Sequence, residues 1–225
     1  MSIEMNLNAV RSRIQQSEKV FSRNPGSVFL LAVSKKQSVD KIKEAIQAGQ
    51  YAFGENYLQE ALPKMALLQD QPCEWHFIGT IQRNKTKKIA EQFSWAHTVT
   101  HEIIAKRLND QRPLHLPPLN ICIEINVSHE STKSGILSDQ LVKLAMYCKT
   151  LPRLNLRGLM TIPSQSTSQI GDRTPFRELA RLKAELHAQG ILLDTLSMGM
   201  SGDLEAAIAE GATIVRVGSA IFGSR

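Results

Sequence analysis

The sequence predicts an α/β protein built as one (β/α)8 TIM barrel with an extra N-terminal helix, in a single domain over residues 1–225. Three observations carry this prediction. Eight short apolar segments alternate with helical patterns, several of those segments are almost continuously hydrophobic, and no GxGxxG turn follows the first. Near-continuous apolar strands are typical of parallel sheets covered on both faces. Eight such units favour a closed barrel, with an open doubly wound sheet as the alternative.

The elements follow one another in a regular order. Leu7, Val10, Ile14 and Phe21 recur at helical spacing, which indicates an opening amphipathic helix. The predicted strands then lie at 28–35, 51–56, 74–80, 94–99, 120–127, 154–162, 195–200 and 213–223. The polar stretch 163–173 lies between a strand and a helix, so we expect a mobile loop over the face that carries function.

Three of the predicted helices have recognisable ends. Ser38 is a suitable N-cap for a helix that Gly49 ends in the left-handed conformation. Thr174 and Pro175 can open a second helix as its N-cap and first residue. A third helix should begin at Ser201, directly after the seventh strand.

Composition limits the classes of function. The formal charge is +6 and the pI about 9.3, but no basic stretch is interleaved with aromatic residues. The positive charge is therefore better explained by basic side chains on solvent-exposed faces than by a nucleic-acid-binding surface. The three cysteines form no CxxC pair, and His76 and His97 have no partner at ligand spacing, so we expect no disulfide framework and no metal site. Without a signal peptide or an apolar run of about 18 residues, a cytoplasmic, non-membrane protein is expected.

Barrel enzymes place function at the carboxyl ends of their strands. Lys35 ends the first predicted strand, and it faces the barrel mouth if Leu31 and Val33 point inward. Partial burial favours the neutral amine that Schiff-base formation with an aldehyde needs. The alternative is an ordinary lysine at a strand end, and Lys36 is a competing amine that should point the other way.

Phosphate is often held after the seventh and eighth strands of such barrels. Ser201 and Gly202 follow the seventh strand, and Gly218 and Ser219 follow the eighth. Hydroxyl groups and free backbone N–H groups at helix starts are suitable anion donors, although an ordinary N-cap explains Ser201 equally well.

Arg216 has the same strand parity as Gly218 and should project into the barrel. A buried guanidinium needs an acceptor. One candidate is an inward carboxylate such as Glu124, and the other is the ring nitrogen of a bound cofactor. The sequence thus predicts an amine after the first strand, phosphate donors after the seventh and eighth strands, and a cation between them. This arrangement indicates a pyridoxal 5'-phosphate site.

The segments AVSK, FGENYLQE, EWHFIGTIQRNK, LRGLMTI, LSMGMSGD and RVGSAIFG occur in this order along the chain. They resemble the pyridoxal phosphate homeostasis protein family, which is related to the N-terminal barrel of alanine racemase. The resemblance implies that Lys35 carries the cofactor and that Arg216 faces its ring nitrogen. It also implies that Ser201, Gly218 and Ser219 hold the phosphate.

Two secondary contacts follow from the same resemblance. Asn56, at the mouth of the second strand, is an expected cofactor contact, and Lys133 is a candidate transient acceptor. The family often has threonine where Ser219 stands, a change that keeps a hydroxyl group. No catalytic residue is assigned.

The function expected is a carrier that binds, buffers and releases pyridoxal phosphate, with apo-enzymes as recipients and a monomer or weak dimer as the assembly. An amino-acid racemase or decarboxylase is the alternative. Alanine racemase has a second, β-rich domain that supplies an acid/base tyrosine, and we expect no such domain here, since the sequence ends at Arg225.

Overall fold

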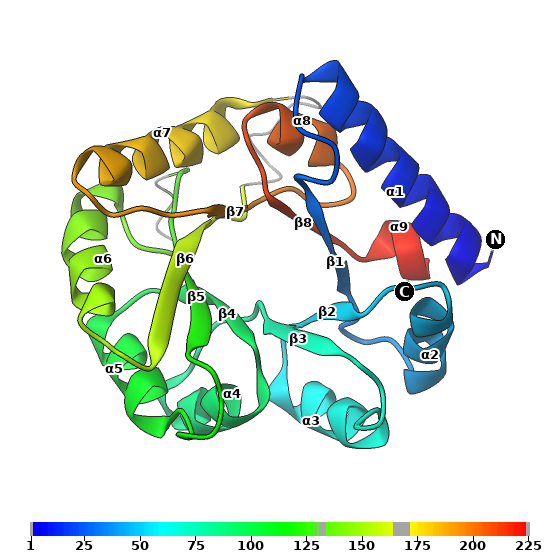
Figure 1. Ribbon diagram of the computed structural model, residues 1–225, viewed down its shortest axis with the longest axis horizontal. Helices are drawn as coiled ribbons and strands as arrows, with labels where there is room; N and C mark the ends of the chain where they lie inside the picture. Colours follow the sequence, from blue (N-terminus) through cyan, green and yellow to red (C-terminus); the bar gives the residue numbers. More distant parts are fainter. Residues whose placement is uncertain (1, 129, 131–133, 164–171, 224–225) are drawn as a thin grey trace.

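Eight parallel strands close into one barrel with the strands in sequence order, surrounded by helices (Figure 1). The computed structural model describes residues 2–128, 130, 134–163 and 172–223. The strands are β1 (Phe29–Val33), β2 (Ala52–Glu55), β3 (Glu74–Phe77), β4 (Trp95–Val99), β5 (Leu119–Glu124), β6 (Leu154–Met160), β7 (Thr195–Ser197) and β8 (Ile214–Val217). Because β1 pairs with β8, the predicted barrel is confirmed and the open sheet is excluded.

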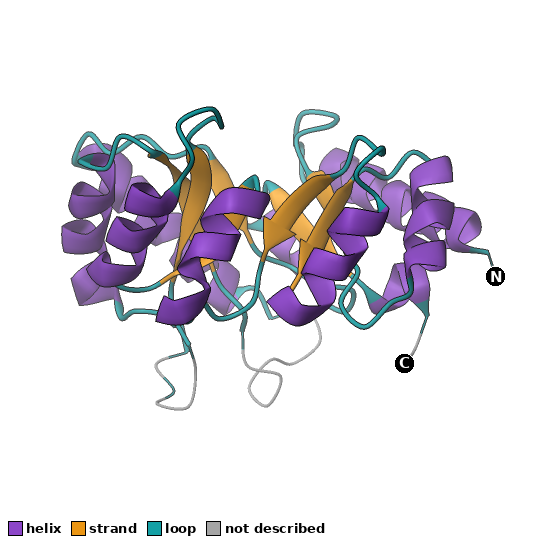
Figure 2. Ribbon diagram, turned by 90° about the horizontal axis from the view of Figure 1, so that it is seen from below, coloured by secondary structure: helices purple, strands orange, loops and turns teal. Residues whose placement is uncertain are grey.

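The helices stand outside the strands, as the side view shows (Figure 2). They are α1 (Ile3–Val20), α2 (Val39–Gln47), α3 (Leu58–Leu67), α4 (Thr86–Gln92), α5 (Glu102–Gln111), α6 (Leu141–Lys149), α7 (Thr174–Ala188), α8 (Leu204–Ala209) and α9 (Ser219–Phe222), with 3-10 turns at Arg83–Lys85 and Ser138–Gln140. Within the described residues, no helix is long and apolar enough to cross a bilayer.

Helix α2 begins as predicted, because the Ser38 hydroxyl accepts a hydrogen bond from the Lys41 N–H at 3.3 Å. The start of α7 differs from the prediction by one residue. Thr174 is already helical, and its N–H donates to the Asp172 carboxylate at 2.9 Å. A carboxylate is a good acceptor for the free N–H groups of the first turn of a helix, so the Asp172 side chain has the capping role that was predicted for Thr174.

The prediction that a helix begins at Ser201 was wrong, because α8 starts at Leu204. Residues 201–203 form a turn. The Met200 N–H donates to the Asp203 carboxylate at 2.5 Å, and the Asp203 N–H returns to the Met200 carbonyl at 3.3 Å. Aspartate side chains often offer the backbone such an alternative to the helix. Ser201 is therefore held in a turn and not at a helix terminus.

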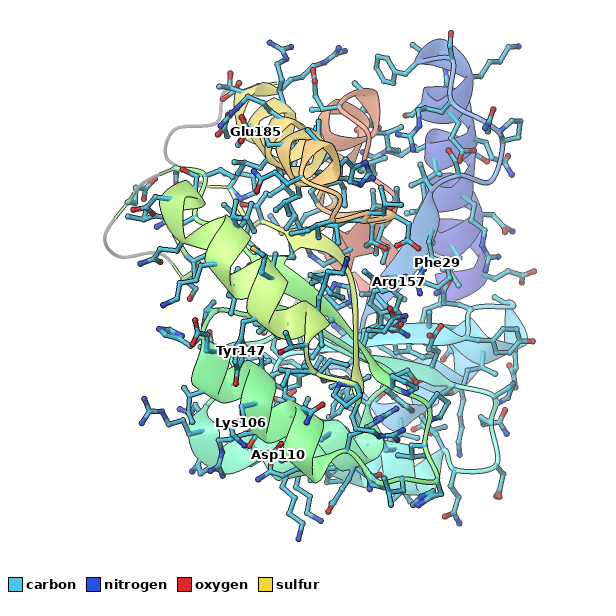
Figure 3. The ribbon with its side chains drawn as sticks, turned by 60° about the vertical axis from the view of Figure 1, so that its left-hand side comes forward. Phe29, Lys106, Asp110, Tyr147, Arg157 and Glu185 are labelled. Atoms are coloured by element: carbon cyan, nitrogen blue, oxygen red, sulfur yellow. The ribbon has the colours of Figure 1, made fainter. Side chains whose placement is uncertain are left out.

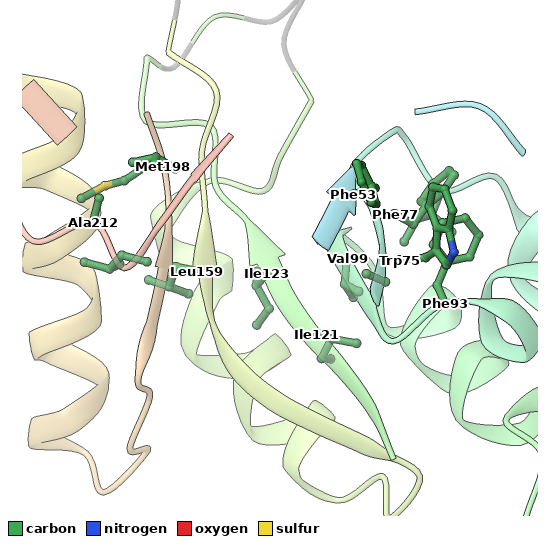
Figure 4. Packing of buried hydrophobic residues seen from close by; sticks show 14 of the residues in the cluster. Phe53, Trp75, Phe77, Phe93, Val99, Ile121, Ile123, Leu159, Met198 and Ala212 are labelled. Carbon is green, nitrogen blue, oxygen red and sulfur yellow. The ribbon is translucent and has the colours of Figure 1, made fainter. Parts of the chain in front are cut away.

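Two apolar layers pack on opposite sides of the strands. The barrel interior is filled by Leu31, Val33, Ala52, Ile78, Trp95, Cys122, Met160 and Ile214. The outer layer lies between strands and helices, and part of it, including Phe53, Phe77 and Ile123, is shown in Figure 4. Strand residues alternate between the two layers, so the predicted inward direction of Leu31 and Val33 is confirmed.

Charged and aromatic groups occupy the end of the barrel where the strands begin. Arg157 forms an ion pair with Asp194 at 2.8 Å, and its guanidinium lies 5.0 Å from the centre of the Trp95 ring. Phe29 begins β1 at the same end, and Figure 3 labels it together with Arg157. The residues predicted to carry function lie at the opposite, carboxyl end.

Candidate functional site

The barrel fold brings all six predicted residues to the carboxyl end of the strands. Lys35 follows β1 by two residues, Asn56 follows β2 directly, and Arg216 lies within β8. Gly218 and Ser219 come directly after β8, where the short helix α9 begins. Ser201, the remaining predicted residue, comes from the loop after β7.

Lys35 and Lys36 have different surroundings. Lys35 is partly buried and lies in the turn that follows β1, two residues beyond Val33 of the barrel interior. Lys36 is exposed, has a φ of 60°, and donates its backbone N–H to the Glu60 carboxylate at 2.8 Å. The left-handed backbone at Lys36 turns the chain away from the strand direction. The two adjacent amines are therefore not equivalent.

A buried polar cluster supports the backbone that precedes Lys35. The Lys64 ammonium donates to the Ser34 carbonyl at 2.8 Å and to the Glu55 carboxylate at 2.7 Å. The Ser34 hydroxyl donates to the same carboxylate oxygen at 2.6 Å. Burial raises the pKa of Glu55, an effect that hydrogen bonds from Lys64 and Ser34 oppose. The end of β1 is thus fixed by an ion pair outside the barrel.

The hydroxyl groups predicted to hold phosphate lie side by side. Ser219 Oγ is 3.3 Å from Ser201 Oγ, although Ser201 lies in the loop after β7 and Ser219 begins α9 after β8. The first N–H groups of α9 have no partner within their helix, as at any helix start. A Cβ atom at Gly218 would lie 3.2 Å from the Val33 carbonyl oxygen, so the loop after β8 packs closely on the end of β1. Around Gly202 there is open space.

Helix α1 holds both loops in place. Arg13 donates to the Ser201 carbonyl at 3.1 Å and pairs with Glu205 at 2.8 Å. Asn6 donates to the Ile221 carbonyl in α9 at 2.8 Å. The extra N-terminal helix therefore positions the two segments that carry Ser201 and Ser219.

Arg216 points into the barrel, as its parity predicted, and it is 4% exposed. Its two terminal nitrogens donate to Ser197 Oγ and to the Thr161 carbonyl, each at 2.8 Å. Among the described residues it forms no ion pair with Glu124, so that expected alternative was wrong. Burial lowers the pKa of Arg216 to about 10, which leaves the guanidinium charged at neutral pH.

Glu124 nevertheless lies within the electrostatic reach of Arg216. Burial raises the pKa of its carboxyl group to about 7, and the positive charge of Arg216 opposes the shift. The inner wall of the barrel thus carries a fixed cation and a carboxyl group that titrates near neutral pH.

Ser197, His97 and His76 form a polar group that was not predicted from the sequence. Ser197 contacts Arg216 directly, and the two histidines are connected to Arg216 through Ser197. His76 Nδ1 and His97 Nε2 are 2.9 Å apart, and His97 Nδ1 lies 2.8 Å from Ser197 Oγ. Both histidines are buried and are internal, as expected. The sequence predicts the two histidines on neighbouring strands, but it does not show that their rings meet, because this depends on the register between β3 and β4.

Asn56 lies on a different part of the rim. It lines a cavity of about 240 Å³ together with residues that follow β3, among them Gly79, Thr80 and Lys85. Its side-chain oxygen is buried and has no hydrogen-bond partner among the described residues. The carboxyl ends of β2 and β3 therefore present an unused acceptor, but no contact within the described residues joins Asn56 to the paired serines.

The donors present fit a phosphorylated aldehyde. Two adjacent hydroxyls and a helix start suit an anion, the Lys35 amine suits an aldehyde, and Arg216 adds a cation that cannot neutralise. Lys133, and residues 164–171 of the loop expected to cover this end, lie outside the described residues. A larger cavity of about 550 Å³ lies at the amino end of the strands, lined by Arg11, Phe29, Tyr51 and Glu74 among others, and contains none of the predicted site residues.

Comparison with known proteins places this geometry in context. Residues 5–225 match the family model described as alanine racemase, N-terminal domain. The chain is 51% identical over 224 residues to the pyridoxal phosphate homeostasis protein of Pseudomonas aeruginosa, and the match covers 100% of this chain and 96% of that protein.

Two solved proteins are similar in structure. PipY of Synechococcus elongatus has been solved without and with PLP bound. The structure without PLP superposes with a TM-score of 0.88 at 36% identity, and the match covers 99% of this chain and 100% of PipY. An alanine racemase from Clostridium difficile superposes with a TM-score of 0.74 at 12% identity. That match covers 100% of this chain and 57% of the racemase, and at this identity it shows the barrel fold alone.

Proposed function

The chain belongs to the pyridoxal phosphate homeostasis protein family, and on this basis we propose that it binds pyridoxal 5'-phosphate and carries, buffers and releases it without catalysis of its own. The observation that supports this function best is the pair of Ser201 and Ser219 hydroxyls beside the end of the strand that leads to Lys35. A phosphate held there lies on the same rim as the amine that bonds the aldehyde.

Each predicted residue has a role in this proposal. Lys35 supplies the amine for a Schiff-base link, while Ser201, Ser219 and the backbone at Gly218 bind the phosphate. Arg216 donates toward the ring nitrogen, and Asn56 is a secondary contact from the cavity after β2. When bound, the cofactor supplies a reactive aldehyde and an aromatic ring that can withdraw electrons.

The arrangement around Arg216 favours a carrier over an enzyme. A guanidinium donates hydrogen bonds and cannot accept the ring proton, so it favours the unprotonated ring, which is the weaker electron sink. A racemase compensates with two strong bases, one on each face of the substrate. Within the described part of the rim, Lys35 is the amine assigned to this role, and we assign no second base.

An amino-acid racemase remains the second candidate, since the fold is shared with alanine racemase. The proposal also includes a single domain over residues 1–225 and a cytoplasmic location. Apo-forms of pyridoxal phosphate enzymes would be the recipients of the cofactor, and the protein would be a monomer or a weak dimer.

Two measurements distinguish the carrier from the enzyme. Protein loaded with pyridoxal phosphate should restore activity to an apo-enzyme that requires it. In deuterium oxide, NMR should show no loss of the α-proton signal of L-alanine or other common amino acids above the background of the free cofactor. Protein-dependent exchange that disappears in Lys35→Ala would establish the enzyme instead.

A further inference from the structure

A continuous series of polar side chains crosses the barrel interior and ends at Arg216. From Arg216 it passes to Ser197 Oγ at 2.8 Å, to His97 Nδ1 at 2.8 Å, and from His97 Nε2 to His76 Nδ1 at 2.9 Å. His76 Nε2 has no hydrogen-bond partner among the described residues and faces the Glu74 carboxylate at 3.7 Å, a distance over which the negative charge acts without a hydrogen bond. These residues come from four different strands, β8, β7, β4 and β3.

We propose that His76, His97 and Ser197 form a hydrogen-bonded series of one fixed direction that positions the Arg216 guanidinium, and that the charge of Glu74, which faces His76 Nε2, sets this direction from the opposite end of the barrel. The expected effect on ligand binding rests on the proposed function. The hydrogen-bonded series of side chains is a property of the ligand-free protein.

The direction follows from the donors and acceptors. Arg216 can only donate, so Ser197 Oγ accepts from it and is free to donate its own proton to His97 Nδ1. His97 then carries its proton on Nε2 and donates it to His76 Nδ1. His76 in turn carries its proton on Nε2, which faces the Glu74 carboxylate.

The opposite direction is disfavoured at both ends. It would place the unprotonated Nε2 of His76 against the Glu74 carboxylate, and it would leave the Ser197 hydroxyl proton without the acceptor that His97 Nδ1 offers. Trp95 fixes the carboxylate by donating its indole N–H to the other oxygen of Glu74 at 3.0 Å. The negative charge of Glu74 thus selects the arrangement in which every donor points toward it.

Both histidines suit this role because burial favours the neutral form of each ring. Burial lowers the pKa of His76, and burial together with His76 and Arg216 holds the pKa of His97 well below its usual range. A neutral imidazole has one donor and one acceptor nitrogen, so each ring transmits the direction set by its neighbour. Hydrogen bonds in such a series polarise one another, which strengthens the acceptor that Ser197 offers Arg216.

The outer end of the chain is accessible. The Glu74 side chain is 43% exposed and lines the 550 Å³ cavity at the amino end of the strands. A substitution there can alter the chain without opening the core. Glu74→Gln keeps the shape of the side chain but removes its charge, and an amide can donate to His76 as well as accept from it.

The test begins with ligand-free protein labelled with 15N in its histidines. Long-range 1H–15N spectra should show His76 and His97 both protonated on Nε2, and Glu74→Gln should shift both rings toward the other tautomer. Asp70→Asn, an exposed carboxylate in the loop before β3, is the matched control and should change neither ring. Protonation on Nδ1 in the wild type, or unchanged rings in Glu74→Gln, would overturn the proposal.

Ligand binding provides the second measurement. Glu74→Gln should weaken pyridoxal phosphate binding by about threefold to tenfold, as expected for a weakened hydrogen bond. It should leave the binding of an analogue with carbon in place of the ring nitrogen unchanged. An unchanged ratio of the two dissociation constants would refute the action of Glu74 on Arg216. If the wild-type protein binds neither ligand, the proposed function is wrong. The histidine tautomers of the ligand-free protein would still test the direction of the hydrogen-bonded series.

Discussion

Ser201 and Ser219 are 18 positions apart in the sequence, yet their hydroxyl oxygens lie 3.3 Å from each other. Neither residue is part of a long helix, and their backbones are held by contacts with α1 and β1. Two hydroxyls at this separation can donate to oxygens of one phosphate group. The pair therefore gives a specific expectation for substitutions.

Ser201→Ala and Ser219→Ala should each weaken pyridoxal phosphate binding by about 1.5–3 kcal/mol, the range for hydrogen bonds to charged groups. Binding of pyridoxal, which lacks the phosphate, should change little. Titration of both ligands by absorbance measures the difference. Ser94→Ala, at the amino end of β4, is the control and should affect neither ligand. Equal losses for the two ligands would mean that the phosphate lies elsewhere.

Lys35, and not Lys36, should carry the covalent link. Lys35 is partly buried in the turn directly after β1, whereas Lys36 is exposed and has a positive φ. Borohydride reduction followed by peptide mapping should place the phosphopyridoxyl group on Lys35. Lys35→Ala should abolish the visible absorbance of the bound cofactor, and Lys36→Ala should keep it. A label mainly on Lys36 would contradict the assignment.

Strand alternation made much of this site predictable. The inward direction of Leu31 and Arg216 follows from position within a strand, a local property that the sequence carries directly. The partnership of His76 and His97 was not predictable in this way. It depends on the register between β3 and β4, in which His76 pairs with Trp95, and register is set by packing of the whole barrel.

Local turn chemistry explains the error at α8. The pattern after β7 suits a helix that begins at Ser201, but Asp203 folds its carboxylate back to the Met200 N–H. The energy difference between a capped helix start and such a turn is small, so the sequence alone does not decide between them. The consequence for function is limited, since Ser201 still reaches Ser219.

The carboxyl group of Glu124 should make stability depend on pH. Its pKa is raised from 4.5 to about 7 by burial, so between these values the folded protein binds this proton more tightly than the unfolded chain does. Stability is therefore lost as pH rises through this window. Glu124→Gln cannot ionise, so its stability relative to wild type should increase by about 3 kcal/mol from about pH 4.5 to about pH 8.

Urea unfolding at a series of pH values measures this difference between Glu124→Gln and the wild type. Asp139→Asn, an exposed carboxylate before α6, is the control and should give a curve parallel to the wild type. A constant difference between Glu124→Gln and the wild type over the whole range would show that Glu124 titrates normally.

Lys64 should be essential to stability because it is the cation of a buried pair. Its side chain is 8% exposed, and its partner Glu55 is fully buried. Lys64→Met leaves the Glu55 carboxylate and the Ser34 carbonyl without this donor, and removing one member of a buried pair costs about 3–5 kcal/mol. Urea unfolding at pH 7 measures the loss. Lys43→Met, an exposed lysine of α2, should change stability by less than about 0.5 kcal/mol.

The pH dependence of Lys64→Met separates lost charge compensation from lost packing. Without Lys64, the pKa of Glu55 should rise further above its ordinary value, since one of the interactions that lowers it is gone. A carboxyl group whose pKa is raised in the folded state makes the protein less stable as pH increases. The free energy of unfolding of Lys64→Met should therefore be lower at high pH than at low pH. Adding Glu55→Gln to Lys64→Met removes the ionisable group and should abolish this slope. If the double variant keeps the slope of the single one, the loss arises from packing around the substituted side chain and not from the charge of Glu55.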